Sequence, residues 1–85
     1  MNTFRAVAVF PHIEPSNLEE FCLLAVQMMV EIQKQESILR YDMFFSANKT
    51  RCTILEEYAH PEAVFDHVKK NAELLQQLSG LGGKI

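Results

Sequence analysis

The chain has 85 residues, of which 48% are hydrophobic, and its eight Lys and Arg against eleven Asp and Glu give a net charge of −3. This length suits one domain, 1–85, with a thin core, so we expect a partner subunit to bury further apolar surface. No basic patch indicates a nucleic-acid partner, and no apolar run approaches the roughly 20 residues that cross a bilayer. We therefore expect a cytoplasmic protein with neither nucleic acid nor membrane as a partner.

The two cysteines, Cys22 and Cys52, lie in separate predicted elements and form no CxxC motif. Zinc sites and disulfide frameworks need cysteines or histidines paired at short spacing. We expect two free thiols, no metal site and no cofactor.

Residues 3–10 are dominated by Phe, Val and Ala, which predicts a strand buried on both faces and ended by Pro11. A helix follows, and either Ser16 with Glu19 or Asn17 with Glu20 can form a capping box at its start. Apolar residues then recur at intervals of three and four, which predicts a helix with one face on a sheet: Leu18, Phe21, Cys22, Ala25, Met28, Met29 and Ile32.

Residues 38–45 and 51–58 carry alternating β-branched and aromatic residues, so we expect them to pair as an antiparallel hairpin across the polar turn 46–50. Asn48 is the residue expected to adopt the left-handed conformation there. A helix is predicted over 61–70, and the apolar set over 71–81 continues it or forms a separate helix that glycines end. The predicted fold class is α+β, a ferredoxin-like βαββα subunit that lacks the last strand of the split βαβ pattern.

Two segments, ESILRYDMF from Glu36 and TILEEYAHPEAVFDH ending at His67, resemble the antibiotic biosynthesis monooxygenase family of the dimeric α/β barrel superfamily. The first strand and helix agree with that family in order and length. The resemblance implies a homodimer in which two ferredoxin-like subunits pack their sheets into a barrel, each with a cavity between sheet and helices. It also implies several activities, among them cofactor-independent oxygenation of quinols and polyketide phenols, and haem degradation, while many members have no known reaction.

The haem-degrading activity fits this sequence poorly. Haem degraders of the family carry a tryptophan where His67 stands and an asparagine on the first strand, which here runs FRAVAV from Phe4. The resemblance therefore favours a reaction without a cofactor.

Glu56 and His67 are the candidate catalytic residues. Alternation along the third strand places Glu56 among apolar and aromatic neighbours, so its carboxylate needs a hydrogen bond, an ion pair or a proton. It either orients a catalytic base or pairs with Arg40 or Arg51 across the hairpin. His67 borders the apolar stripe of the second helix and is either a structural residue or the base that removes a phenolic proton.

Four further residues are expected to line the pocket and contact a small aromatic substrate: Tyr58, Tyr41, Met43 and Val64. Tyrosine combines an apolar ring with a hydroxyl that can hydrogen-bond to a bound oxygen, and methionine adapts its shape. The same residue types also serve as plain core packing.

Two functions stay open on these observations. The first is a cofactor-independent monooxygenase for a small quinol or phenol, in which the substrate ring reduces O2 while the protein provides deprotonation and a dry cavity. The second is a non-catalytic dimeric protein of the same fold that binds a ligand or acts as an accessory subunit. The sequence contains no catalytic triad, metal-ligand set or phosphate loop, which favours the second, whereas the many oxygenases in the family that it resembles favour the first.

Overall fold

The computed structural model describes residues 3–83. Its elements in chain order are β1 (Phe4–Phe10), a 3₁₀ turn (Pro15–Asn17), α1 (Leu18–Ile32), β2 (Ile38–Phe45), β3 (Cys52–Tyr58), α2 (Glu62–Lys70) and α3 (Ala72–Gly82). This order confirms the predicted α+β, ferredoxin-like arrangement, with α3 as a helix separate from α2. No helix in the described range is long and apolar enough to cross a membrane.

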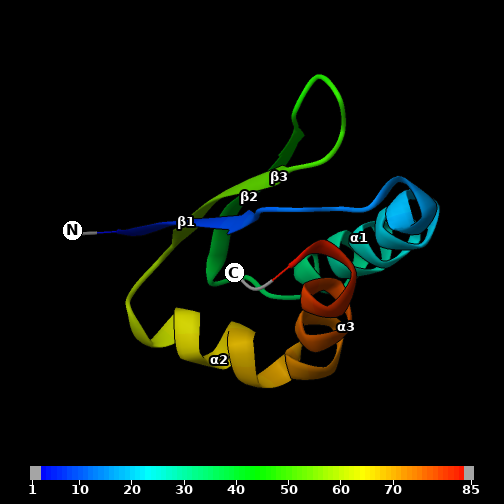
Figure 1. Cartoon of the computed structure of the whole chain (residues 1–85). Coiled ribbons are helices and arrows are strands. Elements are labelled where there is room, and N and C mark those ends of the chain that lie inside the picture. The colour runs from blue at the N-terminus through cyan, green and yellow to red at the C-terminus, as the bar shows by residue number, and fades with distance from the viewer. Residues whose placement is uncertain (1–2, 84–85) are drawn as a thin grey trace.

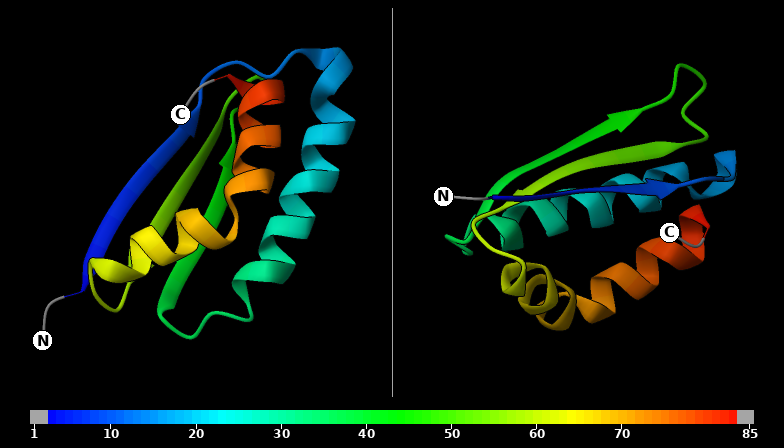
Figure 2. Two further views of the ribbon diagram at one scale, coloured as in Figure 1. Left: turned by 90° about the horizontal axis from the view of Figure 1, so that it is seen from below. Right: turned by 90° about the vertical axis from the view of Figure 1, so that its left-hand side faces the viewer.

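The strands form one antiparallel sheet in the order β1-β3-β2. β1 and β2 therefore run parallel on either side of β3, and α1 connects them as a split βαβ crossover. Figures 1 and 2 show the helices gathered on one face of the sheet, with α1 and α3 side by side and α2 at an angle to them. The other face, called the outer face below, carries these side chains: Arg5, Val7, Val9, Arg40, Asp42, Phe44, Thr53, Leu55 and Glu57.

The core lies between the sheet and the helices, and its centre is Phe21 of α1, which is fully buried. The Phe21 ring meets the rings of Phe10 and Phe45 edge to face, at centroid distances of 5.2 and 6.1 Å. The last residue of α3, Gly82, approaches the same ring so closely that a Cβ there would lie 2.7 Å from Phe21 Cε2. Glycine therefore lets α3 pack directly on α1.

Within the single chain the helices cover β1 on one face only, so its predicted burial on both faces would need a partner on the outer face. Val7, on the outer face, is 65% exposed, whereas Phe10 at the end of the strand is fully buried. The helices cover a single face of the sheet, and an unbroken apolar run does not reveal which face that is.

The predicted capping boxes at α1 are wrong. Ser16 lies inside the 3₁₀ turn, and Asn17, the N-cap residue, makes no side-chain cap hydrogen bond. The backbone of Asn17 is already helical (φ −102°, ψ −4°), whereas a capping side chain needs an extended backbone.

A shift in register sets which side chains of β2 face the helices. Tyr41 pairs with Glu56 and Met43 with Ile54, but the pairing slips between Ile38 and Arg40. Tyr41 and Met43 therefore share the helix-facing side of the sheet with Glu56. Beyond the slip, Ile38 packs on the core.

Candidate functional site

A cavity of about 170 Å³ lies between the sheet and the α2–α3 pair. The cavity exists because Ala6 and Ala8 of β1 have short side chains that do not reach the helices. The lining residues are Ala6, Val7, Ala8, Tyr41, Ile54, Glu56, His67, Val68 and Leu75. Three of the candidate residues, namely Glu56, His67 and Tyr41, thus meet at one cavity.

His67 projects from α2 toward the sheet and is 2% exposed. Its ring lies edge-on to Tyr41, with centroids 5.2 Å apart, and 6.0 Å from the ring of Tyr58. Burial lowers the pKa of the His67 imidazole below its ordinary value of 6.5, so the ring is neutral near pH 7.

Asn71, at the junction of α2 and α3, contacts both the ring and the backbone carbonyl of His67. The Asn71 side-chain nitrogen lies 3.1 Å from His67 Nδ1 and donates to the His67 carbonyl oxygen at 3.0 Å. Asn71 is 4% exposed and was not singled out from the sequence. The signal that could have found it is its spacing, because residues four apart on a helix lie next to each other.

Glu56 accepts a hydrogen bond from the Tyr58 hydroxyl. Burial raises the pKa of the Glu56 carboxyl above its usual value, although the bond from Tyr58 opposes this rise. A half-buried carboxyl that keeps its proton to a higher pH than usual is suited to exchanging protons with a weakly acidic ligand.

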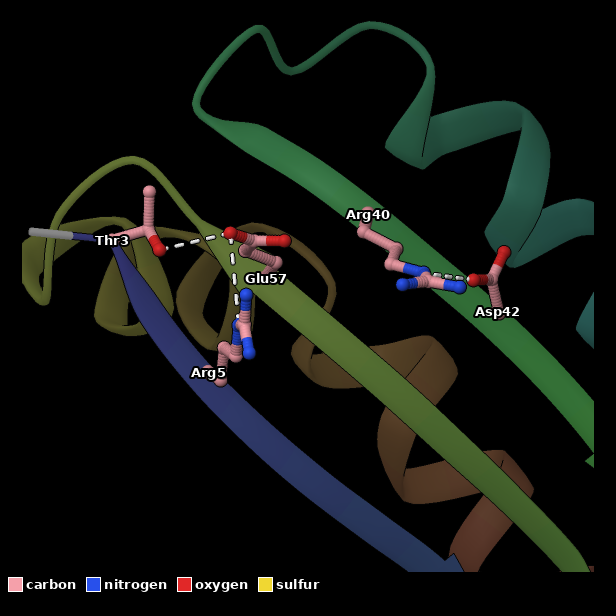
Figure 3. A network of polar contacts seen from close by, with 5 residues as sticks. All are labelled: Thr3, Arg5, Arg40, Asp42 and Glu57. Carbon is pink, nitrogen blue, oxygen red and sulfur yellow. Dashed lines mark hydrogen bonds and ion pairs between the residues drawn. The ribbon is translucent and has the colours of Figure 1, made fainter.

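The expected alternative, an ion pair from Glu56 to Arg40 or Arg51, does not occur among residues 3–83. Arg40 contacts Asp42 on its own strand, as Figure 3 shows on the outer face. The neighbouring carboxylate, Glu57, accepts a hydrogen bond from the Thr3 hydroxyl at 2.8 Å and lies 3.8 Å from Arg5 Nε. The Arg5 and Arg40 side chains thus contact carboxylates on the outer face, and the Glu56 carboxylate is hydrogen-bonded by Tyr58 instead.

The two tyrosines lie in different relations to the cavity. Burial raises the pKa of both hydroxyls, so both are protonated near pH 7. Tyr58 is fully buried, and its hydroxyl donates a hydrogen bond to Glu56. Tyr41 lines the cavity, and its hydroxyl has no hydrogen-bond partner among the described residues and is not sealed from solvent. Tyr41 can therefore donate to a bound oxygen, whereas Tyr58 supports Glu56.

Met43 and Val64 do not line this cavity. Met43 borders a separate apolar groove of about 270 Å³ along α1 and β2, lined by Cys22, Ala25, Val26, Met29, Met43 and Phe45. Val64 is half-buried on α2, one turn before His67. Contact of either residue with a ligand in the 170 Å³ cavity would need the ligand to extend beyond it.

Both cysteines are free thiols, as expected from their separation in the sequence. Burial raises the pKa of the Cys52 thiol to about 11, so it is protonated and unreactive near pH 7. Within residues 3–83, no three His, Cys, Asp or Glu side chains gather as the ligands of a metal ion would.

A larger groove of about 440 Å³ runs between α1 and α3 and is lined mostly by polar side chains, among them Gln27, Glu31 and Gln77. None of the buried titratable side chains described above opens onto it. An apolar pocket with a few convergent polar groups and perturbed pKa values is the usual form of a binding site. The smaller cavity is therefore the candidate functional site.

The size of this cavity limits what it can hold. A cavity of about 150 Å³ in another protein holds one benzene molecule, so about 170 Å³ accommodates a single aromatic ring with small substituents. Glu56, Tyr41 and His67 supply polar groups to such a ring, while Ala6, Ala8 and other apolar residues form the rest of the wall.

No protein-family model and no curated protein matches the chain. Solved structures match it, and these matches cover almost the whole of this chain. A conserved protein from Methanosarcina mazei Go1 superposes with a TM-score of 0.86 at 23% identity, over 98% of this chain and 84% of that one. An antibiotic biosynthesis monooxygenase superposes with a TM-score of 0.84 at 15% identity, over 99% and 90% of the two chains. A protein from Mycobacterium tuberculosis gives 0.84 at 17% identity, over 99% and 87%.

Likeness at these identities shows the fold. The chain has the fold of the antibiotic biosynthesis monooxygenase structures, which confirms the predicted resemblance at the level of architecture. Substrate and activity are a separate question that the residues of the cavity have to answer.

Proposed function

We propose that the chain is a cofactor-independent monooxygenase of a small quinol or phenol with a single aromatic ring. One observation carries the proposal: Glu56, whose pKa burial raises, lines an apolar cavity the size of one ring together with His67 and Tyr41. The fold shared with an antibiotic biosynthesis monooxygenase supports the reaction class.

The reaction needs no external reductant. A hydroquinone and O2 give a hydroxyquinone and water, so one oxygen atom enters the ring, the other leaves as water, and the ring supplies all four electrons. The step that a protein can accelerate is removal of the phenolic proton, because the resulting anion passes electrons to O2 far more readily than the neutral ring.

The cavity residues divide this task between them. Glu56 is the group that takes the phenolic proton, and Tyr58 keeps its carboxylate in place through the hydroxyl bond. Tyr41 and His67 hold the ring oxygens by hydrogen bonds and close the cavity with their rings. A bound ring would itself displace water from the apolar walls before O2 arrives.

Oxygen consumption tests the proposal directly. Purified protein with a single-ring hydroquinone is expected to consume one O2 for each quinol, at a rate proportional to protein concentration and above the spontaneous oxidation without protein. Three-ring phenols of the same acidity are expected to react much more slowly, since they exceed the cavity of about 170 Å³. Saturable binding of the hydroquinone with no added oxygen uptake would contradict the monooxygenase and support the non-catalytic ligand-binding alternative.

We also propose that two copies pair through their outer faces. Val7 and Phe44 are 65% and 51% exposed there, beside Val9 and Leu55, and exposed apolar side chains grouped on one sheet face often mark an interface. Two sheets that stack face to face would bury it at a separation of about 10 Å.

Sedimentation equilibrium measures this pairing. The 9.8 kDa chain is expected to behave as a particle of twice that mass, and Val7→Glu is expected to shift it toward the monomer. A 9.8 kDa species at every concentration would contradict the pairing.

A further inference from the structure

We propose that Asn71 is a positioning residue that holds His67 in the tautomer with its proton on Nε2, so that His67 offers a hydrogen-bond donor to the cavity. This deepens the function proposed above and rests on it, because it decides which of the two catalytic candidates can take the proton. His67 then binds a ring oxygen, and Glu56 alone is left to act as the base.

The backbone fixes which way the Asn71 amide points. The His67 carbonyl oxygen can only accept hydrogen bonds, so the atom of Asn71 that lies 3.0 Å from it is the amide nitrogen. That nitrogen carries two hydrogens. One is directed to the carbonyl oxygen, and the other is available to His67 Nδ1, which lies 3.1 Å away.

The junction between α2 and α3 keeps Asn71 in this place. The Asn71 backbone N–H donates to the His67 carbonyl at 3.0 Å, and the Leu75 N–H donates to the Asn71 carbonyl at 2.9 Å. Asn71 is 4% exposed, although it also borders the groove of about 440 Å³, and both contacts of its amide nitrogen are with His67. Asn71 is therefore a fixed donor and not a mobile surface amide.

A donor at Nδ1 decides the state of the ring. A neutral imidazole carries one proton, and a nitrogen that accepts a hydrogen bond cannot carry it, so the proton resides on Nε2. A second proton at Nδ1 would place two donors against each other. Burial already disfavours the charged ring, and Asn71 acts in the same direction.

Nε2 has access to the cavity. It has no hydrogen-bond partner among residues 3–83, yet no fully buried side-chain nitrogen or oxygen in that range lacks one, so Nε2 is not sealed off. The open space that His67 lines is the cavity. The titratable groups that face the ring are Tyr41 from β2 and Glu56 with Tyr58 from β3, while Val68 and Leu75 of the helices are apolar.

The ligand class follows from this polarity. His67 Nε2–H and the Tyr41 hydroxyl are donors, and Glu56 is the acceptor. A hydroxylated ring that gives its proton to Glu56 then has an oxygen anion facing two donors. A ring whose only polar group is a donor, such as an aniline, would leave both of these donors without a partner and should bind more weakly.

Long-range proton–nitrogen NMR spectra of the intact, labelled chain measure the tautomer without a substrate. In the wild type near pH 7.5, His67 is expected to show a protonated Nε2 and an unprotonated Nδ1. His12 and His60, which are largely exposed, serve as internal references. A His67 ring with its proton on Nδ1 would overturn the inference, and this readout needs no variant to fold.

Two variants sharpen the test. In Asn71→Asp the new carboxylate accepts a hydrogen bond, so the proton of His67 is expected to move to Nδ1 and its pKa to rise. Asn71→Leu removes the donor and is expected to give a mixture of tautomers. At a pH where the His67 ring of Asn71→Asp is neutral, Nε2 is no longer a donor, and this variant should turn over a hydroquinone about tenfold more slowly, the cost of one neutral hydrogen bond.

The two proposals fail in different ways. If His67 keeps its proton on Nε2 in Asn71→Asp, the positioning role is overturned even when the wild type is active. If the wild type consumes no oxygen but shows the expected tautomer and its reversal in Asn71→Asp, the positioning role stands and the monooxygenase proposal falls.

Discussion

Phe21→Ala is expected to lower the free energy of unfolding by about 3–5 kcal/mol, the usual cost of emptying a large aromatic site in a core. Phe21 is fully buried and its ring contacts Phe10 of β1 and Phe45 of β2 edge to face, while Gly82 of α3 approaches the same ring closely. Neighbours from three elements cannot all close the gap at once. Urea unfolding followed by circular dichroism measures the change.

Phe65→Ala is the matched control for this substitution. Phe65 lies on α2 and is 74% exposed, so removal of its ring is expected to change the unfolding free energy by no more than about 0.5 kcal/mol. Equal losses for the two variants would show that Phe21 is not at the centre of the core.

Glu56→Gln is expected to reduce turnover of a single-ring hydroquinone by about 10²–10⁴-fold, the range that general base catalysis contributes. Glutamine has the same shape and still accepts the hydrogen bond from Tyr58, but it cannot take a proton. In the wild type, kcat/KM should rise with pH through the raised pKa of Glu56, hence above its ordinary value of 4.5, and the variant should lack that rise.

Glu57→Gln is the control for the loss of a carboxylate. Glu57 is the next residue on β3, but its side chain lies on the outer face with Thr3 and Arg5 (Figure 3). This variant is expected to keep the turnover and the pH profile of the wild type. A similar loss in both variants would show that neither carboxylate acts as the base.

The same raised pKa has a consequence for stability. Because burial raises the pKa of Glu56 in the folded chain, the folded chain binds this proton more tightly than the unfolded chain does. The contribution of Glu56 to stability therefore falls as the pH rises from about 4.5 through the raised pKa. Glu56→Gln removes this contribution, which pH-dependent unfolding of the two proteins would show.

Much of the fold was readable from the sequence, because side chains repeat with the period of their element. The intervals of three and four in α1 placed Phe21, Ala25 and Met28 on the buried face, where the structure has them. Alternation along β3 placed Glu56 on the same face as Ile54, which is also what the structure shows. Local periodicity therefore found the face of the candidate site.

The details that periodicity missed depend on the backbone. The slip between Ile38 and Arg40 puts Ile38 on the core and leaves Leu39 exposed, which simple alternation along β2 cannot reveal. In the hairpin, Lys49 and not Asn48 has the positive φ, of 60°. Asn48 instead accepts hydrogen bonds from its neighbours through its side chain, a role that suits its residue type equally well.

Side-chain contacts were the hardest part of the site to predict. The sequence left two roles open for Glu56, orienting a base or pairing with an arginine, and did not predict its bond from the hydroxyl of Tyr58, two residues along the same strand. The lining by Ala6 and Ala8 and the support from Asn71 depend on how α2 and α3 lie over the sheet. That arrangement is set by packing in the core, which no single segment encodes.

The fate of labelled oxygen tests the central claim most directly. When the protein turns over a single-ring hydroquinone under ¹⁸O2, mass spectrometry is expected to find one ¹⁸O in the quinone product and the other in water. The protein-dependent labelled product should nearly vanish with Glu56→Gln. An unlabelled quinone accompanied by hydrogen peroxide, or a labelled product formed equally fast by Glu56→Gln, would contradict the claim that this cavity carries out monooxygenation.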